Sequence, residues 1–346
     1  MNTEFKNRVF GCIILKSINS NFNADFTRRP RTLPDGTVYS TDKALKYTIR
    51  DFFRKYYPED KIFYVKRNNE ETLAPLTLAE TYRLLFGEFE TIKKERKGKK
   101  GKINNDENKK EEDEEKINKI KTLPKLLECI DIRLFGATFT GNGNIGIHGT
   151  VQINHGVNRY PENEIYTEDI LSPFPTEPSK DNSTIGNQTN LKEGHYVFHY
   201  SINPLNLHEY FDLVNKMEGK NVCLSLQDIQ KLKYAFNNSV SSVDTTRKIN
   251  TDNELTLWIQ MKEKSRKMLP SLTELVEVER REGTVIIDLT TIEQMLETIK
   301  EDVELIEIYY NPITTKVRGL ENDNIVHHFN ILNNKEIAHE YEAHIG

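Results

Sequence analysis

The sequence predicts an α+β fold, because segments of strand character and segments of helix character alternate along the chain of 346 residues. Residues 9–15 form an apolar run of strand length, and residues 194–203 alternate aromatic and polar side chains. Residues 284–310 follow the order strand, helix, strand. This pattern favours a central antiparallel sheet with helices packed on one face, of the ferredoxin-like or RNA-recognition type, with insertions.

The first predicted strand leads into a loop that is rich in asparagine and positive charge. Residues 9–15 are apolar enough for a buried strand, whereas residues 16–31 hold one Lys, three Arg and three Asn. Residues 5–55 contain eleven Lys and Arg and four Asp, a net charge of +7 in a chain whose total is −5. Such a concentration of positive charge in a chain that is acidic elsewhere predicts a focused polyanion site.

A helix is predicted over residues 41–56, after the turn signal Pro34-Asp35-Gly36, with Thr41 as its cap. Its apolar positions recur at helical spacing and are Leu45, Thr48, Ile49, Phe52, Phe53 and Tyr56. Another face carries four neighbouring cations, Lys43, Lys46, Arg50 and Arg54. A bound phosphate would relieve their mutual repulsion. The alternative is a solvated basic face that is balanced by Asp42 and Asp51.

The composition is that of a globular protein with a large core, in one elaborate domain or two smaller ones. Cys12, Cys129 and Cys223 lie far apart in apolar surroundings, so we expect reduced core thiols. The apolar run near the N-terminus has about eight residues, which is too short for a membrane span, and no cleavage signal follows it. We therefore predict a cytoplasmic protein.

The rest of the chain mixes insertions with regular elements. Residues 92–121 are almost entirely Lys, Glu, Asn, Asp and Gly, which predicts a charged, disordered insertion. Residues 141–149 match Gly-x-Gly-x-x-Gly, but a strand and not a helix is predicted to follow, which excludes a dinucleotide fingerprint. Residues 165–191 fit a long protruding loop or hairpin, residues 205–238 are helical in pattern, and residues 254–261 fit a strand.

Several separated segments of the first two hundred residues stand in a recognisable order. They are the loop 17–30, the turn and helix start Gly36-Thr37-Val38-Tyr39-Ser40-Thr41-Asp42-Lys43 with 50–52, then Asp131-Ile132-Arg133-Leu134-Phe135-Gly136, Gly149-Thr150-Val151-Gln152-Ile153 and 185–203. Together they resemble the RNA-binding backbone subunit of Cascade, the type I CRISPR effector complex, in its type I-B form. Ser241-Ser242-Val243-Asp244-Thr245-Thr246-Arg247 also looks like a segment of that family. The chain departs from the family at Lys16-Ser17-Ile18-Asn19 and Ala24-Asp25, where the family often has Arg-Ser-Asn and Gly-Asp.

The resemblance implies a hand-shaped protein with an RNA-recognition-type palm, a helical insertion and a thumb hairpin. The implied divisions are the first part of the palm with the RNA-binding loop and helix (1–91), the disordered insertion (92–121), the palm continuation (122–164), the thumb (165–191) and the palm completion (192–346), with the helical insertion at about 205–280. Copies would polymerise along the guide RNA (crRNA), with each neighbouring thumb kinking out a base at regular intervals. The other bases would pair with target DNA. The implied further partners are the guide 5′-end-capping subunit, the large and small subunits and the guide-processing endonuclease, and no cofactor is implied.

In such an assembly, base pairing reads the sequence, so the protein needs only phosphate and sugar contacts. Lys and Arg suit phosphates, and Asn and Ser add hydrogen bonds without base preference. The candidate RNA-binding residues are Lys16, Ser17, Asn19, Asn21, Arg28, Arg29, Lys43, Lys46 and Arg50. The sequence lacks the paired aromatic signature of ordinary RNA-recognition motifs, so backbone binding is favoured over base stacking on the sheet.

No catalytic site is predicted, and two alternatives stay open. Related backbone subunits of type III complexes cleave target RNA with an aspartate in the loop after the first strand, and Asp25 lies in a comparable region. A loop Asp is more often a turn residue, and no His or second carboxylate is paired with it in sequence. His195 and His199 lie about 13 Å apart on one strand, too far for a shared metal. The second alternative is a scaffold that binds protein partners and no RNA.

Overall fold

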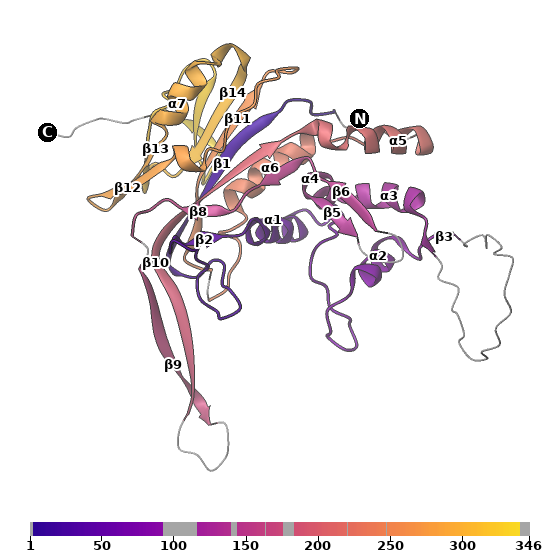
Figure 1. Ribbon diagram of the computed structural model, residues 1–346, viewed down its shortest axis with the longest axis horizontal. Helices are drawn as coiled ribbons and strands as arrows, with labels where there is room; N and C mark the ends of the chain where they lie inside the picture. The colour runs from indigo at the N-terminus through magenta and orange to yellow at the C-terminus, as the bar shows by residue number, and fades with distance from the viewer. Residues whose placement is uncertain are drawn as a thin grey trace, which may run out of the picture. The chain divides into compact units, whose positions relative to one another are not determined.

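The computed structural model describes residues 3–92, 116–139, 144–162, 164–175, 183–219, 221–246 and 248–339. The chain divides into two compact units. Unit 1 comprises Met1–Tyr57, Val151–Pro204 and Leu224–Gly346, and unit 2 comprises Pro58–Thr150 and Leu205–Cys223. Helices and strands occur in both units (Figure 1), which confirms the predicted mixture of α and β structure.

Unit 1 is built on a ten-stranded sheet with the strand order β17-β16-β14-β11-β1-β10-β8-β2, and β7 and β9 also pair with β10 (Figure 1). The strands are β1 (Val9–Ser20), β2 (Tyr39–Ser40), β7 (Val151–Ile153), β8 (Gly156–Asn158), β9 (Ile165–Pro175), β10 (Ser183–Ile202), β11 (Thr251–Met261), β14 (Val303–Tyr310), β16 (Val326–Asn330) and β17 (Lys335–Ile337). A second sheet consists of β12 (Glu277–Arg281), β13 (Thr284–Asp288) and β15 (Thr315–Arg318). The main helices are α1 (Asp42–Tyr56), α6 (Leu226–Asn238) and α7 (Thr290–Glu297).

The central strand β1 pairs antiparallel with β10 on one edge and with β11 on the other. This confirms the predicted strand at 9–15, but β1 continues to Ser20. The first five residues of the predicted loop at 16–31 are therefore strand. The reason is that their backbone continues the ladder, so that Ser17 lies opposite both Gly194 and Thr251.

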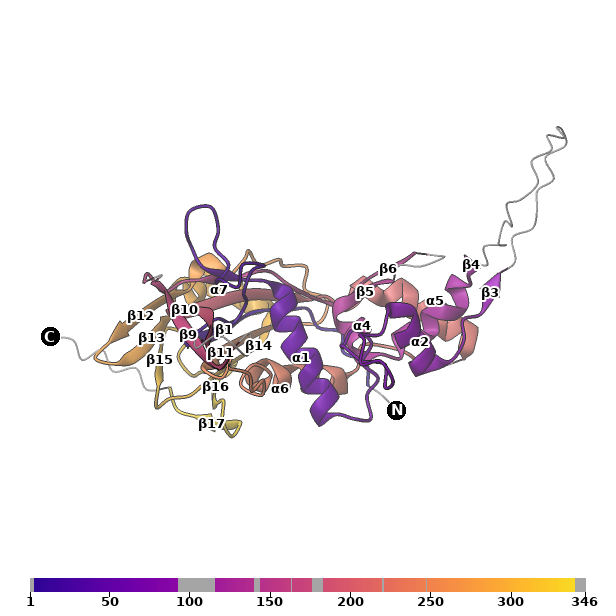
Figure 2. The same cartoon turned by 90° about the horizontal axis from the view of Figure 1, so that it is seen from below.

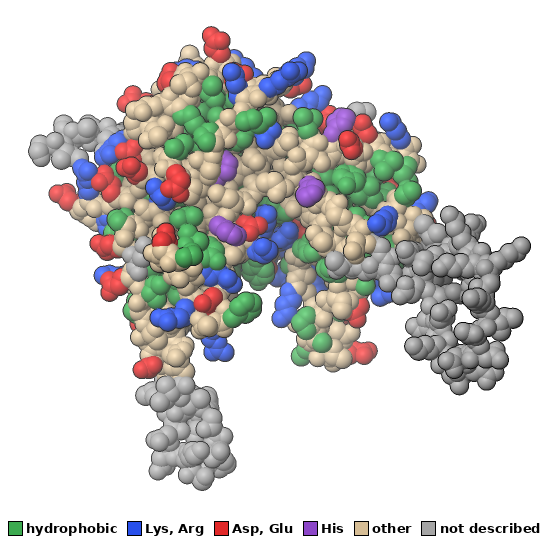
Figure 3. Space-filling view, viewed as in Figure 1, with side chains coloured by type: hydrophobic (Ala, Val, Ile, Leu, Met, Phe, Trp, Pro, Cys, Tyr) green, Lys and Arg blue, Asp and Glu red, His purple; other side chains and the backbone are tan. Residues whose placement is uncertain are grey.

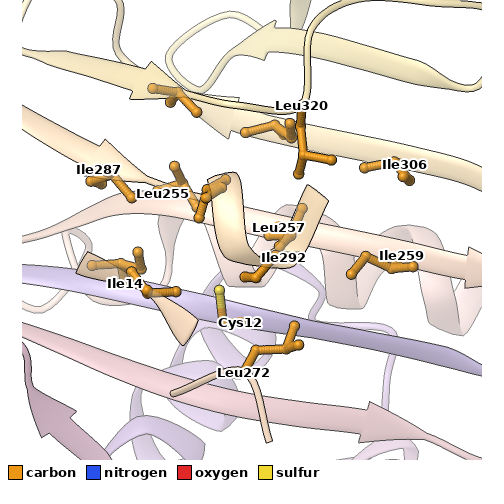
Figure 4. Close-up of a cluster of buried hydrophobic side chains, with 14 of the residues drawn as sticks. Cys12, Ile14, Leu255, Leu257, Ile259, Leu272, Ile287, Ile292, Ile306 and Leu320 are labelled. Atoms are coloured by element: carbon orange, nitrogen blue, oxygen red, sulfur yellow. The ribbon is translucent and has the colours of Figure 1, made fainter. Parts of the chain in front are cut away.

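Both faces of the sheet are covered. On one face, Cys12 and Ile14 of β1 pack with Leu257 of β11, Ile292 of α7 and side chains of the second sheet (Figure 4). On the other face lie α1 and α6, which pack side by side (Figures 1 and 2). The prediction that the helices cover only one face is therefore wrong. Residues 9–15 are buried without a break because the side chains that point to either face of the sheet are enclosed.

Gly11 of β1 leaves room for a side chain of β10 to cross β1 and form a hydrogen bond with β11. Tyr200 of β10 lies across Gly11 and donates a hydrogen bond from its hydroxyl to the Leu257 carbonyl of β11, at 3.0 Å. A Cβ at Gly11 would stand 2.1 Å from that carbonyl oxygen and 2.5 Å from the tyrosine ring. Any side chain at this position would displace the tyrosine, so the residue is glycine because of a close approach and not because of a turn.

Unit 2 consists of short helices and hairpins. Its elements are α2 (Leu78–Phe86), β3 (Thr91–Ile92), β4 (Lys116–Ile117), α3 (Lys119–Leu127), α4 (Ile130–Phe135), β5 (Gly136–Phe139), β6 (Ile145–His148) and α5 (His208–Glu218). The apolar pattern of residues 131–139 favours a strand, but only the second half of this segment is strand, and its first half belongs to α4. This helix has nearly all its side chains buried, so its sequence shows no helical period. The buried Asp131 carboxylate accepts hydrogen bonds from the backbone N–H groups of Phe63 and Tyr64, at 2.8 and 2.9 Å.

The later elements follow the sequence predictions unevenly. Residues 284–310 are strand, helix, strand, as predicted, although β13 and β14 belong to different sheets. A helical insertion is predicted at about 205–280, but the α-helices of this segment end at Asn238, because residues 251–261 and 277–281 form the strands β11 and β12. Residues 205–223 belong to unit 2. The glycine-rich link is described from residue 144, and it continues as strand β6 without a helix.

The three cysteines are buried and form no disulfide, as predicted. Among the described residues, no helix is long and apolar enough to cross a membrane.

A buried charge network ties the two sheets of unit 1 together. His195 of β10 is fully buried, and its ring nitrogens face the carboxylates of Glu254 on β11 and Glu193 on β10. Arg280 of β12 donates to Glu193, with 3.1 Å between Nε and Oε1. Burial alone would lower the pKa of His195, but the two carboxylates overcome that effect and raise it to about 9. The centre of the Tyr160 ring lies 5.4 Å from the centre of the His195 ring.

We expect the charge of His195 to make stability depend on pH. The folded-state pKa lies above the ordinary value, so the stabilisation is complete below pH 6.5 and is lost as the pH rises through about 9. Its size is on the order of 3 kcal/mol. The free energy of unfolding of the wild type minus that of His195→Gln, measured with denaturant, should shrink between these two pH values. Parallel pH profiles for wild type and His195→Gln would contradict the assignment.

Candidate nucleic-acid interface

The cation-rich loop after β1 is fixed to the start of α1 by one asparagine. The Asn23 side-chain oxygen accepts two hydrogen bonds from Thr41, one from its backbone N–H and one from its hydroxyl, both at 2.9 Å. Thr41 in turn caps α1 by accepting from the Ala44 N–H at 3.3 Å, which confirms the predicted cap. The loop projects from the sheet beside β2 (Figures 1 and 2). The loop and the first helical turn therefore form one surface of unit 1.

The end of β1 contributes structure more than contact surface. Ser17 is fully buried, and its hydroxyl lies 3.2 Å from that of Thr251 on β11. The Ser20 hydroxyl bonds to the same threonine at 3.0 Å. Lys16 is half-buried, with its ammonium 4.0 Å from the Asp252 carboxylate. Of the two predicted contacts Lys16 and Ser17, the serine is thus enclosed by the sheet and has no exposed surface for a direct RNA contact.

The two predicted asparagines have opposite environments. Asn19 is exposed, has a left-handed backbone with φ 48°, and accepts a hydrogen bond from the Tyr166 hydroxyl of β9 at 3.1 Å. Asn21 is buried and donates to the backbone carbonyls of Arg28 and Thr189, both at 3.1 Å. Asn21 therefore holds the loop against β10 and is not a surface contact.

A tight turn at 25–29 presents the two predicted arginines. The Asp25 N–H donates to the Arg29 carbonyl at 2.8 Å, and the Arg28 N–H donates to the Asp25 carbonyl at 3.1 Å. Arg28 has a left-handed backbone with φ 68°, and both arginines are exposed. Within the described residues, neither guanidinium forms an ion pair or a hydrogen bond with another group. Their positive charge is therefore available to a ligand.

The Asp25 carboxylate forms hydrogen bonds within that turn. Its carboxylate accepts from the Thr27 hydroxyl at 2.7 Å and from the Arg29 N–H at 3.0 Å. These two hydrogen bonds hold the pKa of Asp25 below its usual range. Among the described residues, no three His, Cys, Asp or Glu side chains are grouped as metal ligands.

The basic stripe of α1 exists but is partly neutralised. Lys43 is the most exposed of its cations, with 86% of its side chain accessible. Lys46 is only 12% accessible and pairs with Asp42 at 3.0 Å, and Arg54 pairs with Asp51 at 2.5 Å. Arg50 is half-buried. Figure 3 shows Lys and Arg side chains gathered over α1. The solvated-face alternative thus describes Lys46 and Arg54. Lys43 also stands 3.9 Å from the Asp42 carboxylate, but its side chain is largely accessible, so it can still reach a ligand.

The buried face of α1 is close to the prediction. Leu45, Thr48, Ile49, Phe52 and Phe53 are all buried, and Tyr56 is the exception, at 57% exposure. Near the end of the helix, the one-turn spacing of the apolar positions still brings the Tyr56 ring to 4.6 Å from Phe52.

Sequence reasoning missed two exposed aromatic residues and a pocket. Tyr47 is exposed between Lys43 and Arg50, four residues after one and three before the other, so helix spacing contained the signal. Phe26 is fully exposed in the turn at 25–29. A pocket of about 420 Å³ is lined by residues 21–24 and by Thr245, Thr246 and Lys248.

Lys248 lies at the wall of this pocket. Its ammonium donates to the Phe22 carbonyl at 2.7 Å and stands 4.4 Å from the centre of the Phe22 ring. Burial lowers the pKa of Lys248 to about 8. Residues 245–246 belong to the segment that resembles the family, and Arg247 of that segment lies outside the described residues.

The segment predicted as a loop or hairpin at 165–191 is a ribbon in its described part. Strands β9 and β10 pair antiparallel, with Tyr166 opposite Asn190 and Thr167 opposite Thr189. The described side chains of 165–170 and 186–191 include Glu168 and Asp169 but no Lys or Arg. These described positions of the ribbon therefore offer hydroxyl, amide and carboxylate groups to a ligand.

Comparison with known proteins gives one family. The model of the family described as CRISPR-associated protein Cas7 matches residues 7–301. The chain is also similar to a solved structure described as a CRISPR RNA-guided surveillance complex, at 11% identity over 88% of each chain with a TM-score of 0.46. A second, described as the same complex before nicking, has 11% identity, covers 93% of this chain and 96% of its own, and has a TM-score of 0.49. No curated protein sequence matches the chain.

We expect Asn21→Ala to destabilise the fold without removing an RNA contact. The substitution leaves two backbone carbonyls without their donor, which costs about 1–3 kcal/mol of unfolding free energy. Asn187→Ala, at an exposed ribbon position, should change it by less than about 0.5 kcal/mol. Denaturant titration measures both. A drop in RNA affinity at unchanged stability would restore Asn21 as a direct contact.

Proposed function

The chain belongs to the CRISPR-associated protein Cas7 family, and from this premise we propose that it is a crRNA-binding backbone subunit of a type I-B Cascade complex. Copies would polymerise along the guide RNA and present its bases to invading target DNA in antiviral defence. The proposed partners are the crRNA, target DNA through the guide, further copies of this chain, the 5′-end-capping subunit, the large and small subunits and the guide-processing endonuclease.

The observation that carries the RNA-binding role is the exposed charge of Arg28, Arg29 and Lys43 on one anchored surface. Asn23 joins the loop that bears the arginines to the helix start that bears the lysine. Lys and Arg hold phosphates without reading bases, which suits a protein whose guide supplies the sequence specificity. Lys43 also stands in the first turn of α1, where the helix dipole adds to the attraction for an anion.

The chain topology supports a ferredoxin-like palm. The elements β1, α1, β8, β10, α6 and β11 follow one another in this order, and the sheet order of the strands is β11-β1-β10-β8. Both neighbours of β1 are antiparallel to it, and α1 packs against α6. We propose that the β9–β10 ribbon is the thumb of this hand and that the division into palm and thumb follows the type I subunits.

We propose that the chain is not catalytic. The alternative, cleavage of target RNA through Asp25 as in type III complexes, requires a carboxylate that is available to the substrate. The hydrogen bonds that the Asp25 carboxylate accepts from Thr27 and Arg29 come from its own turn, and they shape the loop that carries Arg28 and Arg29. This role in shaping the turn explains why an aspartate stands at position 25.

RNA retention should depend on the two arginines of the turn. Purified after co-expression with a CRISPR array and the guide-processing endonuclease, the wild type should carry array-derived RNA in a large particle, and Arg28→Glu with Arg29→Glu should carry much less. With single-stranded RNA in a binding titration, loss of two phosphate contacts should make the slope of log affinity against log salt shallower by about 1.4.

The matched control is Lys335→Glu on β17, at the opposite edge of the sheet from β2, which should bind like the wild type. Equal binding by the double variant and the wild type would contradict the loop as a phosphate site. A wild type that binds no RNA in either assay would favour the scaffold that binds protein partners only.

Substitutions at Asp25 should separate turn formation from catalysis. Asp25→Asn keeps an oxygen that accepts the same hydrogen bonds, so it should retain RNA binding, whereas Asp25→Ala should weaken it. Neither variant nor the wild type should cleave complementary RNA in a gel assay. Specific cleavage by the wild type that both substitutions abolish would establish the type III-like alternative.

A further inference from the structure

Phe26 is held in full solvent exposure at the tip of the turn at 25–29. Its exposed fraction is 101%, and no other large hydrophobic residue between 3 and 46 is exposed. A phenylalanine in this position gains nothing from burial, because none of its surface leaves the water on folding. The fold therefore does not account for an aromatic side chain at this position.

The turn that carries Phe26 is rigid. Two backbone hydrogen bonds close it between Asp25 and Arg29, and the Asp25 carboxylate adds two more from Thr27 and Arg29. A fifth comes from the buried Asn21, which holds the Arg28 carbonyl. Ala24 and Pro30 are bridged at the base of the turn. The backbone that carries the ring is thus fixed before any ligand arrives, so little backbone entropy is lost on contact.

The surroundings of Phe26 favour a nucleic-acid base over a protein. Protein interfaces bury contiguous apolar patches, with charged residues depleted at their centre. Phe26 instead stands alone beside Arg28 and Arg29, whose side chains are exposed. An aromatic ring flanked by cations offers stacking to a base and charge to the adjoining phosphates, which is the usual combination in single-strand binding.

We propose that Phe26 is a stacking platform for an unpaired base of the bound RNA. The inference rests on the proposed RNA-binding function and adds a base contact to a surface otherwise suited to the backbone. Arg28 and Arg29 hold the phosphates next to the stacked nucleotide. Since every base has an aromatic face, the contact is independent of sequence and compatible with any guide.

The test uses the full-length chain and a fluorescein-labelled single-stranded RNA of mixed sequence. Phe26→Ala should lower the affinity roughly fivefold to a hundredfold, the range for one lost base stack. Phe26→Tyr should bind like the wild type, and Phe26→Leu, which is apolar without a stacking face, should bind like Phe26→Ala. Thermal unfolding of all three should match the wild type, because the ring is fully exposed.

Phe26→Trp adds a direct readout of stacking. The chain has one tryptophan, Trp258, which is fully buried, so the new indole would be the only exposed one in the described part. Its fluorescence should be quenched by the mixed-sequence RNA, and much less by a matched RNA made abasic along its length. The phosphates are the same in both, so only stacking separates the two results.

The outcomes separate this inference from the proposed function. If the wild type binds RNA but Phe26→Ala binds equally well and the indole of Phe26→Trp is not quenched, the stacking platform is wrong while the backbone function stands. If the wild type binds no RNA, the proposed function itself fails. If Phe26→Ala loses self-association but keeps its RNA affinity, the ring contacts a neighbouring copy of the chain, which also overturns the inference.

Discussion

The pairing of β1 along both edges is the constraint on which the candidate interface depends. Its last residues are held by β10 on one side and β11 on the other, and the hydroxyls of Ser17 and Ser20 meet at Thr251. Asn21 and Asn23 then continue this anchorage from the sheet to β10 and to the start of α1. A loop that begins from so fixed a strand can hold charges at defined positions without contributing to the core.

The sequence predicted those elements whose burial is one-sided or continuous. Helix α1 was predictable because one face is buried, and β1 because a run of seven apolar residues at 9–15 is too short for most helices. Helix α4 was not, since almost every side chain in it is buried and no period remains. The second layer over the sheet was also missed, because contacts between β11 and α7 join distant parts of the chain.

Residue type alone did not separate surface contacts from structural ones in the candidate site. Asn19 and Asn21 are two residues apart and chemically identical, yet one is exposed and the other is buried. The difference arises because Asn21 finds two backbone carbonyls, one of them in a strand 168 residues away. Such long-range partners are invisible to local patterns, whereas Arg28, Arg29 and Lys43 stay at the surface because a charge is rarely buried without a partner.

The edges of the large sheet bear on how copies of the chain can coexist at high density. The main path ends in β2, with two residues, and β17, with three. Strands this short leave few unsatisfied backbone groups, which limits edge-to-edge pairing between molecules. In the proposed assembly many copies are crowded along one RNA, the condition under which open sheet edges lead to aggregation. At these two edges the short terminal strands would therefore leave the spacing of such a polymer to its guide.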